Sequence, residues 1–245
     1  MSETKTVVLD AGHDAGNLAN RSPDGTYYEH EFCLDMAKRM AVHLRRCGAA
    51  VTETRPDGGA VSLAARCAAA NAIAGLDLFV SLHSNAAGSA GWSDARGWSA
   101  YLYGEGGARE QAAKAILTRV RETGTAVRSS PIVYDPALYV LKHTAAPAVL
   151  IEHAFHTNRN DVENLKSQDW RAALARAQAR GIAEFLGLAW VDEAAPAPPE
   201  DRELTAAVDA LAAAGVIDSP DRWKALEYTD KSVRALLIKM AAKLG

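Results

Sequence analysis

Short apolar runs alternate with segments of helical spacing along the first three quarters of the chain. An apolar run begins at Thr6 and stops at His13, which is typical of a buried strand. The next segment, Glu29–Cys47, repeats apolar residues every three or four positions and ends before Gly48, which predicts a helix packed by one face. The same alternation then predicts strands at 49–55, 76–84, 97–103 and 147–155, and helices at 62–73, 108–122 and 170–186.

Strands that alternate with helices predict an α/β fold, in which a twisted, mostly parallel sheet is flanked by helices. The regular pattern ends near residue 190, and a stretch rich in Pro, Ala and acidic residues follows at 191–202. Residues 203–245 return to helical spacing, with a Ser-Pro helix start between two apolar patterns. We therefore expect a main domain at 1–190, a linker at 191–202 and a small all-helical module at 203–245.

Composition excludes several classes of protein. The 245 residues carry a net charge of −3 and show no dense Lys/Arg stripe, which argues against a nucleic-acid partner. The sequence holds no apolar run long enough to span a membrane. Its three cysteines lack CxxC spacing and are expected to be small buried residues. Because Met1–Lys5 is polar and a strand follows directly, we expect synthesis in the cytoplasm without a signal peptide.

Three residues whose side chains could bind a metal or act in catalysis fall near the ends of predicted strands. His13 follows the first strand, His83 ends the third, and Glu152 lies in the last. Ligands bind at the carboxyl ends of parallel strands, so these side chains are expected at one edge of the sheet. Glu29 opens the first long helix and offers a carboxylate nearby. Two histidines and a carboxylate, with one position open to water, form a frequent catalytic zinc shell.

Other acidic and histidine residues compete for these roles. Glu31 competes with Glu29, because the two point about 200° apart on a helix and only one can face a metal. His153 and His156 form an H-x-x-H pair, but on an extended strand they point to opposite faces. His143 could contact substrate or lie on the surface. His30 and His43 are expected to be solvated helix positions.

Four segments in order resemble the zinc-dependent N-acetylmuramoyl-L-alanine amidases of bacterial cell walls and phage endolysins. They are "LDAGHDAG", "EHEFCLDMAKRMAVHLRRCGAAVTETR", "SLAARCAAANAIAGLDLFVSLHSNA" and "YVLKHTAAPAVLIEHAFHTN". The resemblance spans about residues 6–187 and implies that His13, Glu29 and His83 hold zinc while Glu152 acts in catalysis. It also favours Glu29 over Glu31.

This resemblance implies a peptidoglycan hydrolase that cleaves the amide between N-acetylmuramic acid and the L-alanine of the stem peptide. Asn85, Tyr101 and His143 are candidate substrate contacts. An enzyme without an export signal would reach the wall after release, by holin-assisted lysis or lysis of a mother cell. The phage or bacterial origin, the wall chemotype and the oligomeric state stay open.

Two alternatives belong to other functional classes. One is a wall-binding protein that keeps the fold but hydrolyses weakly or not at all. The other is a different zinc peptidase or deacetylase, although the chain lacks the HExxH signature. In the C-terminal module, Trp223 and Tyr228 could stack on sugars or pack in a core.

Overall fold

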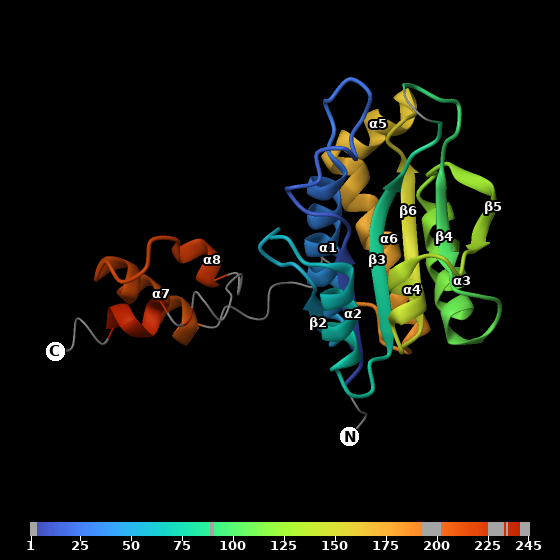
Figure 1. The fold of residues 1–245 in the computed structure, drawn as a ribbon. Helices are drawn as coiled ribbons and strands as arrows, with labels where there is room; N and C mark the ends of the chain where they lie inside the picture. The colour runs from blue at the N-terminus through green and yellow to red at the C-terminus, as the bar shows by residue number, and fades with distance from the viewer. Residues whose placement is uncertain (1–3, 89–90, 193–201, 225–232, 234, 241–245) are drawn as a thin grey trace. The chain divides into compact units, whose positions relative to one another are not determined.

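The computed structural model describes residues 4–88, 91–192, 202–224, 233 and 235–240 (Figure 1). The chain divides into two compact units, Met1–Val191 and Asp192–Gly245. None of the helices in these described ranges is long and apolar enough to cross a membrane.

The first unit contains six strands and six helices in its described residues. The strands are β1 (Thr6–Ala11), β2 (Ala50–Glu53), β3 (Leu78–Asn85), β4 (Trp98–Leu102), β5 (Val127–Tyr134) and β6 (Ala148–Phe155). The helices are α1 (Glu29–Arg46), α2 (Leu63–Asn71), α3 (Gly107–Glu122), α4 (Tyr139–His143), α5 (Arg159–Lys166) and α6 (Gln168–Phe185).

The six strands form one mixed sheet in the order β2-β1-β3-β6-β4-β5. All neighbouring pairs are parallel except β4 and β6, which run antiparallel. The predicted α/β fold with a mostly parallel sheet is therefore confirmed. The sequence pattern missed the edge strand β5 and the short helices α4 and α5.

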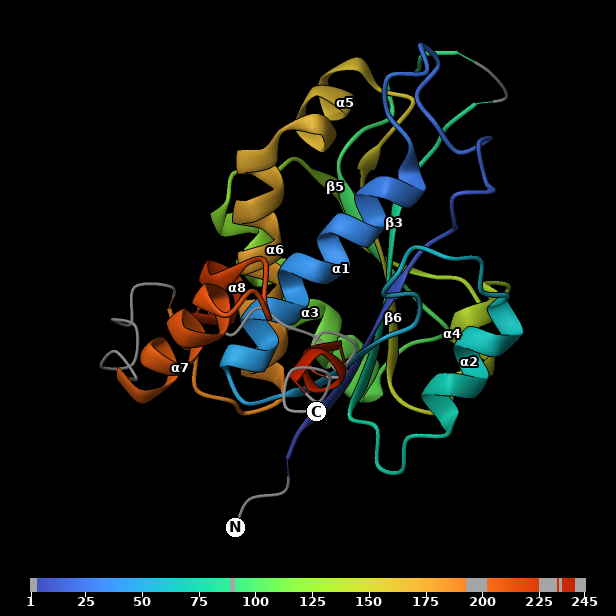
Figure 2. The same cartoon turned by 90° about the vertical axis from the view of Figure 1, so that its left-hand side faces the viewer.

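Helices cover both faces of the sheet (Figure 2). The larger core lies between the sheet and α1, α3 and α6, and includes Phe32, Met36 and Ile116. The smaller core lies under α2 and α4 and includes Phe79 and Leu150. Figure 2 shows α1, α3 and α6 on one side of the sheet and α2 and α4 on the other. Near the carboxyl ends of β3 and β6, His83 and Glu152 are partly exposed.

Several local predictions agree with the structure. Ser62 caps α2, because its hydroxyl accepts a hydrogen bond from the Ala65 N–H at 3.2 Å. The three cysteines are free and buried. The expectation that His43 is a solvated helix position was wrong. His43 is only 6% exposed, and the centroid of its ring lies 5.8 Å from that of Trp190.

The second unit is helical where it is described. It contains α7 (Arg202–Ala213) and α8 (Pro220–Lys224), the latter starting at the predicted Ser-Pro pair. Val208, Val216 and Ile217 form a small core against which Trp223 packs. Trp223 thus contributes to packing, while Tyr228 and most of the predicted linker lie outside the described residues.

Candidate metal centre

His13 occupies a strained loop directly after β1. Its φ is +55°, the one positive value at a non-glycine position among the described residues. This left-handed conformation is costly for a residue with a Cβ, so the surroundings must hold it. The imidazole then lies against Glu29, with Nε2 3.2 Å from Glu29 Oε2. The side-chain amides of Asn17 and Asn20 contact the same ring at 2.8–3.1 Å.

Two buried arginines hold the carbonyl groups of this loop. Arg55 donates to Ala11 O at 2.7 Å and to Gly12 O at 2.9 Å. Arg66 donates to His13 O at 2.7 Å and to the carboxylate of the buried Asp10 at 2.9 Å. These contacts fix the backbone on both sides of His13. Sequence reasoning gave neither arginine a role, because arginines are mostly exposed and nothing in their spacing marks them.

Glu29 is the acidic centre of the site. Its side chain is 3% exposed, and its two oxygens contact His13 and His83, the latter at 3.1 Å from Nδ1. The backbone N–H of Ser84 also donates to Oε1 at 2.9 Å. Burial would by itself raise the pKa of Glu29, but hydrogen bonds to His13 and His83 hold that pKa well below its usual range. The carboxylate is thus ionised in a buried place, and a buried charge of this kind favours a cation beside it.

His83 lies on β3 and faces the same region as Glu152 on β6. The two residues are direct register partners across the parallel strands. His83 packs edge-on to His13 with ring centroids 5.0 Å apart. A Cβ on Gly12 would lie 2.3 Å from the His83 ring, so only glycine leaves room for it. His13, Glu29 and His83 each offer a ligand atom, and these atoms all lie within 4.8 Å of one another.

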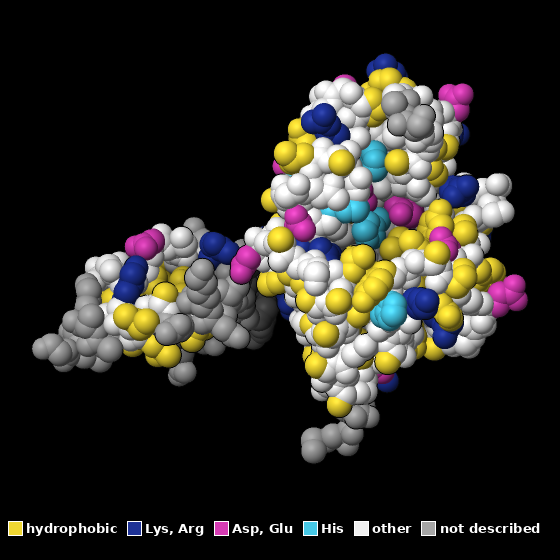
Figure 3. All heavy atoms as spheres, viewed as in Figure 1, with side chains coloured by type: hydrophobic (Ala, Val, Ile, Leu, Met, Phe, Trp, Pro, Cys, Tyr) yellow, Lys and Arg dark blue, Asp and Glu magenta, His cyan; other side chains and the backbone are white. Residues whose placement is uncertain are grey.

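Glu152 stands beside this trio without belonging to it. Its Oε2 is buried and has no hydrogen-bond partner within the part of the chain that the structure describes. Burial raises the pKa of the Glu152 carboxyl well above its usual range, and the negative charge of Glu29 raises it further. Figure 3 shows histidine and acidic side chains gathered in a hollow of the surface, on the face that carries α2 and α4.

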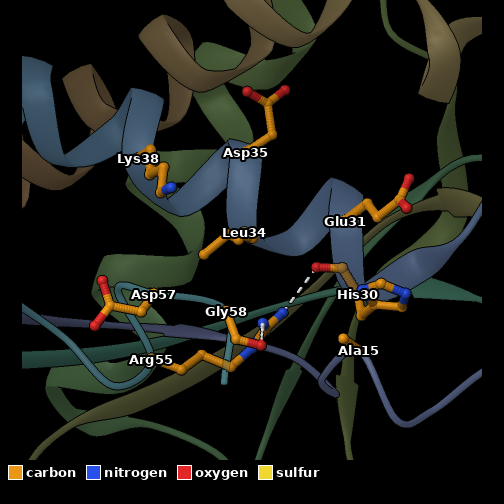
Figure 4. A pocket seen from close by; sticks show the side chains of 9 residues that line it. All are labelled: Ala15, His30, Glu31, Leu34, Asp35, Lys38, Arg55, Asp57 and Gly58. Atoms are coloured by element: carbon orange, nitrogen blue, oxygen red, sulfur yellow. Dashed lines mark hydrogen bonds between the residues drawn. The ribbon is translucent and has the colours of Figure 1, made fainter. Parts of the chain in front are cut away.

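Glu31 lies elsewhere. Its exposed side chain lines a separate pocket of about 400 Å³ with His30, Lys38, Asp57 and other residues (Figure 4). Figure 4 also shows Arg55 at this pocket, donating to the backbone carbonyls of His30 and Gly58. Of the two competing carboxylates, the structure therefore brings Glu29 to the histidines.

His153 and His156 contact different partners. His153 Nδ1 donates to His83 O at 2.8 Å, and its ring packs edge-on to Phe32 of α1 at 5.0 Å. His156 lies 3.0 Å from Ser84 Oγ and 3.9 Å from Glu29 Oε2, measured from Nδ1. Both are buried, and His156 borders the Glu29 carboxylate.

The three candidate substrate contacts fall in two places. Asn85 ends β3 and donates to the hydroxyl of Tyr101 on β4 at 3.3 Å, close to Glu152 in the sheet. His143 ends α4, before β6 begins, and its exposed ring packs against that of Tyr139 at 4.2 Å. Asn85 and Tyr101 thus form one group, and His143 lies apart from it.

The site fits a zinc ion. Two imidazoles and one carboxylate are a donor set that catalytic zinc takes, with a further position for water or substrate. The buried negative charge of Glu29 and the convergence of the three ligand atoms favour the same ion. Glu152, whose Oε2 has no hydrogen-bond partner among the described residues, lies across from His83 in the sheet.

Comparison with known families gives one match over most of the first unit. Residues 7–184 match the family model described as N-acetylmuramoyl-L-alanine amidase. The amidase LytC of Bacillus subtilis is 30% identical over 184 residues, which are 74% of this chain and 35% of LytC. The endolysin of Bacillus phage SPP1 is 32% identical over 196 residues, which are 76% of this chain and 67% of the endolysin.

A solved structure has the same fold. The catalytic domain of CwlV, an N-acetylmuramoyl-L-alanine amidase from Bacillus (Paenibacillus) polymyxa var. colistinus, superposes with a TM-score of 0.68 at 29% identity. The match covers 76% of this chain and all of that domain. The chain spans about a third of the length of LytC and two thirds of that of the phage endolysin.

Proposed function

The chain belongs to the N-acetylmuramoyl-L-alanine amidase family, and from this membership and the site geometry we propose that it is a zinc-dependent peptidoglycan hydrolase. Its reaction is hydrolysis of the amide between the lactyl group of N-acetylmuramic acid and the L-alanine of the stem peptide. The relatives named as amidases and endolysin support this substrate.

His13, Glu29 and His83 would hold the zinc. When bound, zinc supplies Lewis acidity, which polarises an amide carbonyl and acidifies water. The chain itself supplies the orientation of these ligands. Arg55 and Arg66 hold the loop of His13, and Gly12 leaves space for the His83 ring.

Glu152 would move the proton, and its position is the observation that carries the proposal. Its buried Oε2 has no partner among the described residues and lies across from His83 in the sheet. An unsatisfied carboxylate oxygen in an active site can take a proton from the attacking water. The same group can then return the proton to the departing amine of L-alanine. The raised pKa of Glu152 suits this second step, because the protonated form is stabilised.

We further propose that residues 1–190 form the catalytic domain, that 191–202 link it to the rest, and that 203–245 form a module that binds the wall. The division of the chain into units at Val191 and Asp192 supports this boundary. Asn85, Tyr101 and His143 are proposed substrate contacts.

Hydrolysis of a soluble muropeptide tests the proposal. The zinc-loaded protein is expected to release free L-alanine amino termini without new reducing sugar ends. Glu152→Gln should keep its zinc and lose activity by about 10²- to 10⁴-fold, because an amide cannot carry the proton. His83→Ala is the matched comparison and should lose zinc as well. New reducing ends, cleaved cross-links or a Glu152→Gln variant of near-normal rate would refute the proposed chemistry.

A further inference from the structure

We propose that Arg128 and Tyr101 form a subsite for the α-carboxylate of the second residue of the stem peptide, the residue that follows the L-alanine. This inference rests on the proposed function, because it assigns the part of the substrate that leaves with L-alanine.

The sheet brings Arg128 to the same edge as Glu152. Ser99 of β4 pairs with Glu152, and Val127 of β5 pairs with Trp98, the residue before Ser99, so Arg128 follows a residue paired beside this position. Because β5 runs antiparallel to β6, its first residues lie near the carboxyl end of β6. The guanidinium of Arg128 lies over the ring of Phe155 on β6, 5.6 Å from its centroid. The side chain therefore reaches back across β4 toward the catalytic edge.

Tyr101 connects Arg128 to the residues of the site. Arg128 Nη1 donates to the Tyr101 hydroxyl at 3.3 Å, and Asn85 Nδ2 donates to the same oxygen at 3.3 Å. The Ala86 N–H donates to Asn85 Oδ1 at 2.8 Å, which fixes the direction of the Asn85 amide. Because the hydroxyl oxygen accepts both bonds, its proton is left to donate to a third group.

The charge of Arg128 also lacks a counterpart. Some arginines of this unit pair with carboxylates, such as Arg119 with Glu184 and Arg171 with Asp35. Within the described ranges Arg128 makes no ion pair; it is exposed and is held by a ring and a hydroxyl instead. A guanidinium held by neutral groups keeps donors free for a carboxylate from outside.

The spacing fits a peptide. Two strand spacings, about 9–10 Å, separate the backbones of β6 and β5. Two extended residues span about 7 Å, and the arginine side chain closes the remaining gap. The second residue of the stem carries an α-carboxyl group that is a carboxylate in some walls and a carboxamide in others. Arg128 would favour the carboxylate, and the Tyr101 hydroxyl would donate to the peptide carbonyl of the preceding L-alanine.

Two soluble muramyl tripeptides test this inference, one with D-glutamate and one with D-isoglutamine as the second residue. With the full zinc-loaded chain, kcat/KM is expected to be about 10-fold higher for the free acid, because a charge-assisted hydrogen bond is lost in the amide. Arg128→Gln should remove this preference, mainly by raising KM for the acid. Arg128→Lys should keep part of it, since the charge remains without the planar fork.

Arg180→Gln is the matched control. Arg180 lies on α6, on the opposite face of the sheet, where it pairs with Glu184. This variant removes the same charge and should keep the wild-type preference. Equal hydrolysis of the two tripeptides by the wild type, or an unchanged preference in Arg128→Gln, would overturn the subsite alone. Failure of the wild type to hydrolyse either tripeptide at this amide would instead overturn the proposed function, and the subsite with it.

Discussion

A single methyl group at Gly12 should weaken zinc binding without removing any ligand. The Cβ of Gly12→Ala would lie 2.3 Å from Cε1 of His83 and 2.6 Å from its Nδ1. Ordinary carbon contacts lie near 3.5 Å, so the ring must retreat by about 1 Å. Metal–ligand distances tolerate only about 0.2 Å, so the displaced imidazole can no longer meet the ion together with His13 and Glu29. We expect zinc affinity to fall by about 10- to 100-fold, the range for lost support of a ligand.

The fold should survive this change. The clash involves a side chain, which can rotate away at a cost of about 1 kcal/mol. Competition with a chelator of known affinity measures the zinc constant, and urea unfolding of the metal-free protein measures stability. Gly59→Ala is the matched control, because a Cβ there meets nothing within 4 Å. If Gly12→Ala bound zinc as tightly as Gly59→Ala does, the proposed role of His83 as a ligand would be refuted.

Two further changes test the domain boundary and the buried ion pair of Arg66 with Asp10. A chain ending at Ala197 should fold, bind zinc and cut soluble muropeptides at nearly the full rate, because residues 1–191 form their own compact unit. The same chain should digest intact walls more slowly. Equal loss of activity on both substrates would reject the two-domain proposal. Arg66→Met should lower the free energy of unfolding by about 3–5 kcal/mol, because it leaves Asp10, which is 1% exposed, as an unpaired buried charge. Adding Asp10→Asn should recover part of that loss in urea unfolding, whereas a double variant no more stable than Arg66→Met would show that the pair is not the cause.

The parts of the fold that could be predicted are those whose apolar pattern is continuous. β3 and β6 are buried on both faces, so their runs stand out in the sequence. β5 was missed because it is a half-exposed edge strand containing Pro131, and its pairing with β4 shifts register between Trp98 and Ala100. The antiparallel direction of β4 against β6 depends on long-range pairing, which periodicity does not encode.

In the candidate site, too, some residues could be predicted from the sequence and others could not. His13, His83 and Glu152 could be proposed from their places after or within apolar strands. The two arginines that hold the His13 loop could not, because their partners are backbone carbonyls from a distant segment. The burial of His43 likewise depends on Trp190, which lies far along the chain and packs beside it only in the folded state.

We propose that this chain cuts one amide of peptidoglycan with zinc held by His13, Glu29 and His83. The most direct measurement counts new L-alanine amino termini in purified peptidoglycan treated with the chelated protein, before and after one equivalent of zinc is added. Almost no release is expected before zinc is added and rapid release afterwards, with no new reducing ends at any time. Equal release by the rigorously metal-free protein, or reducing ends in place of amino termini, would contradict it.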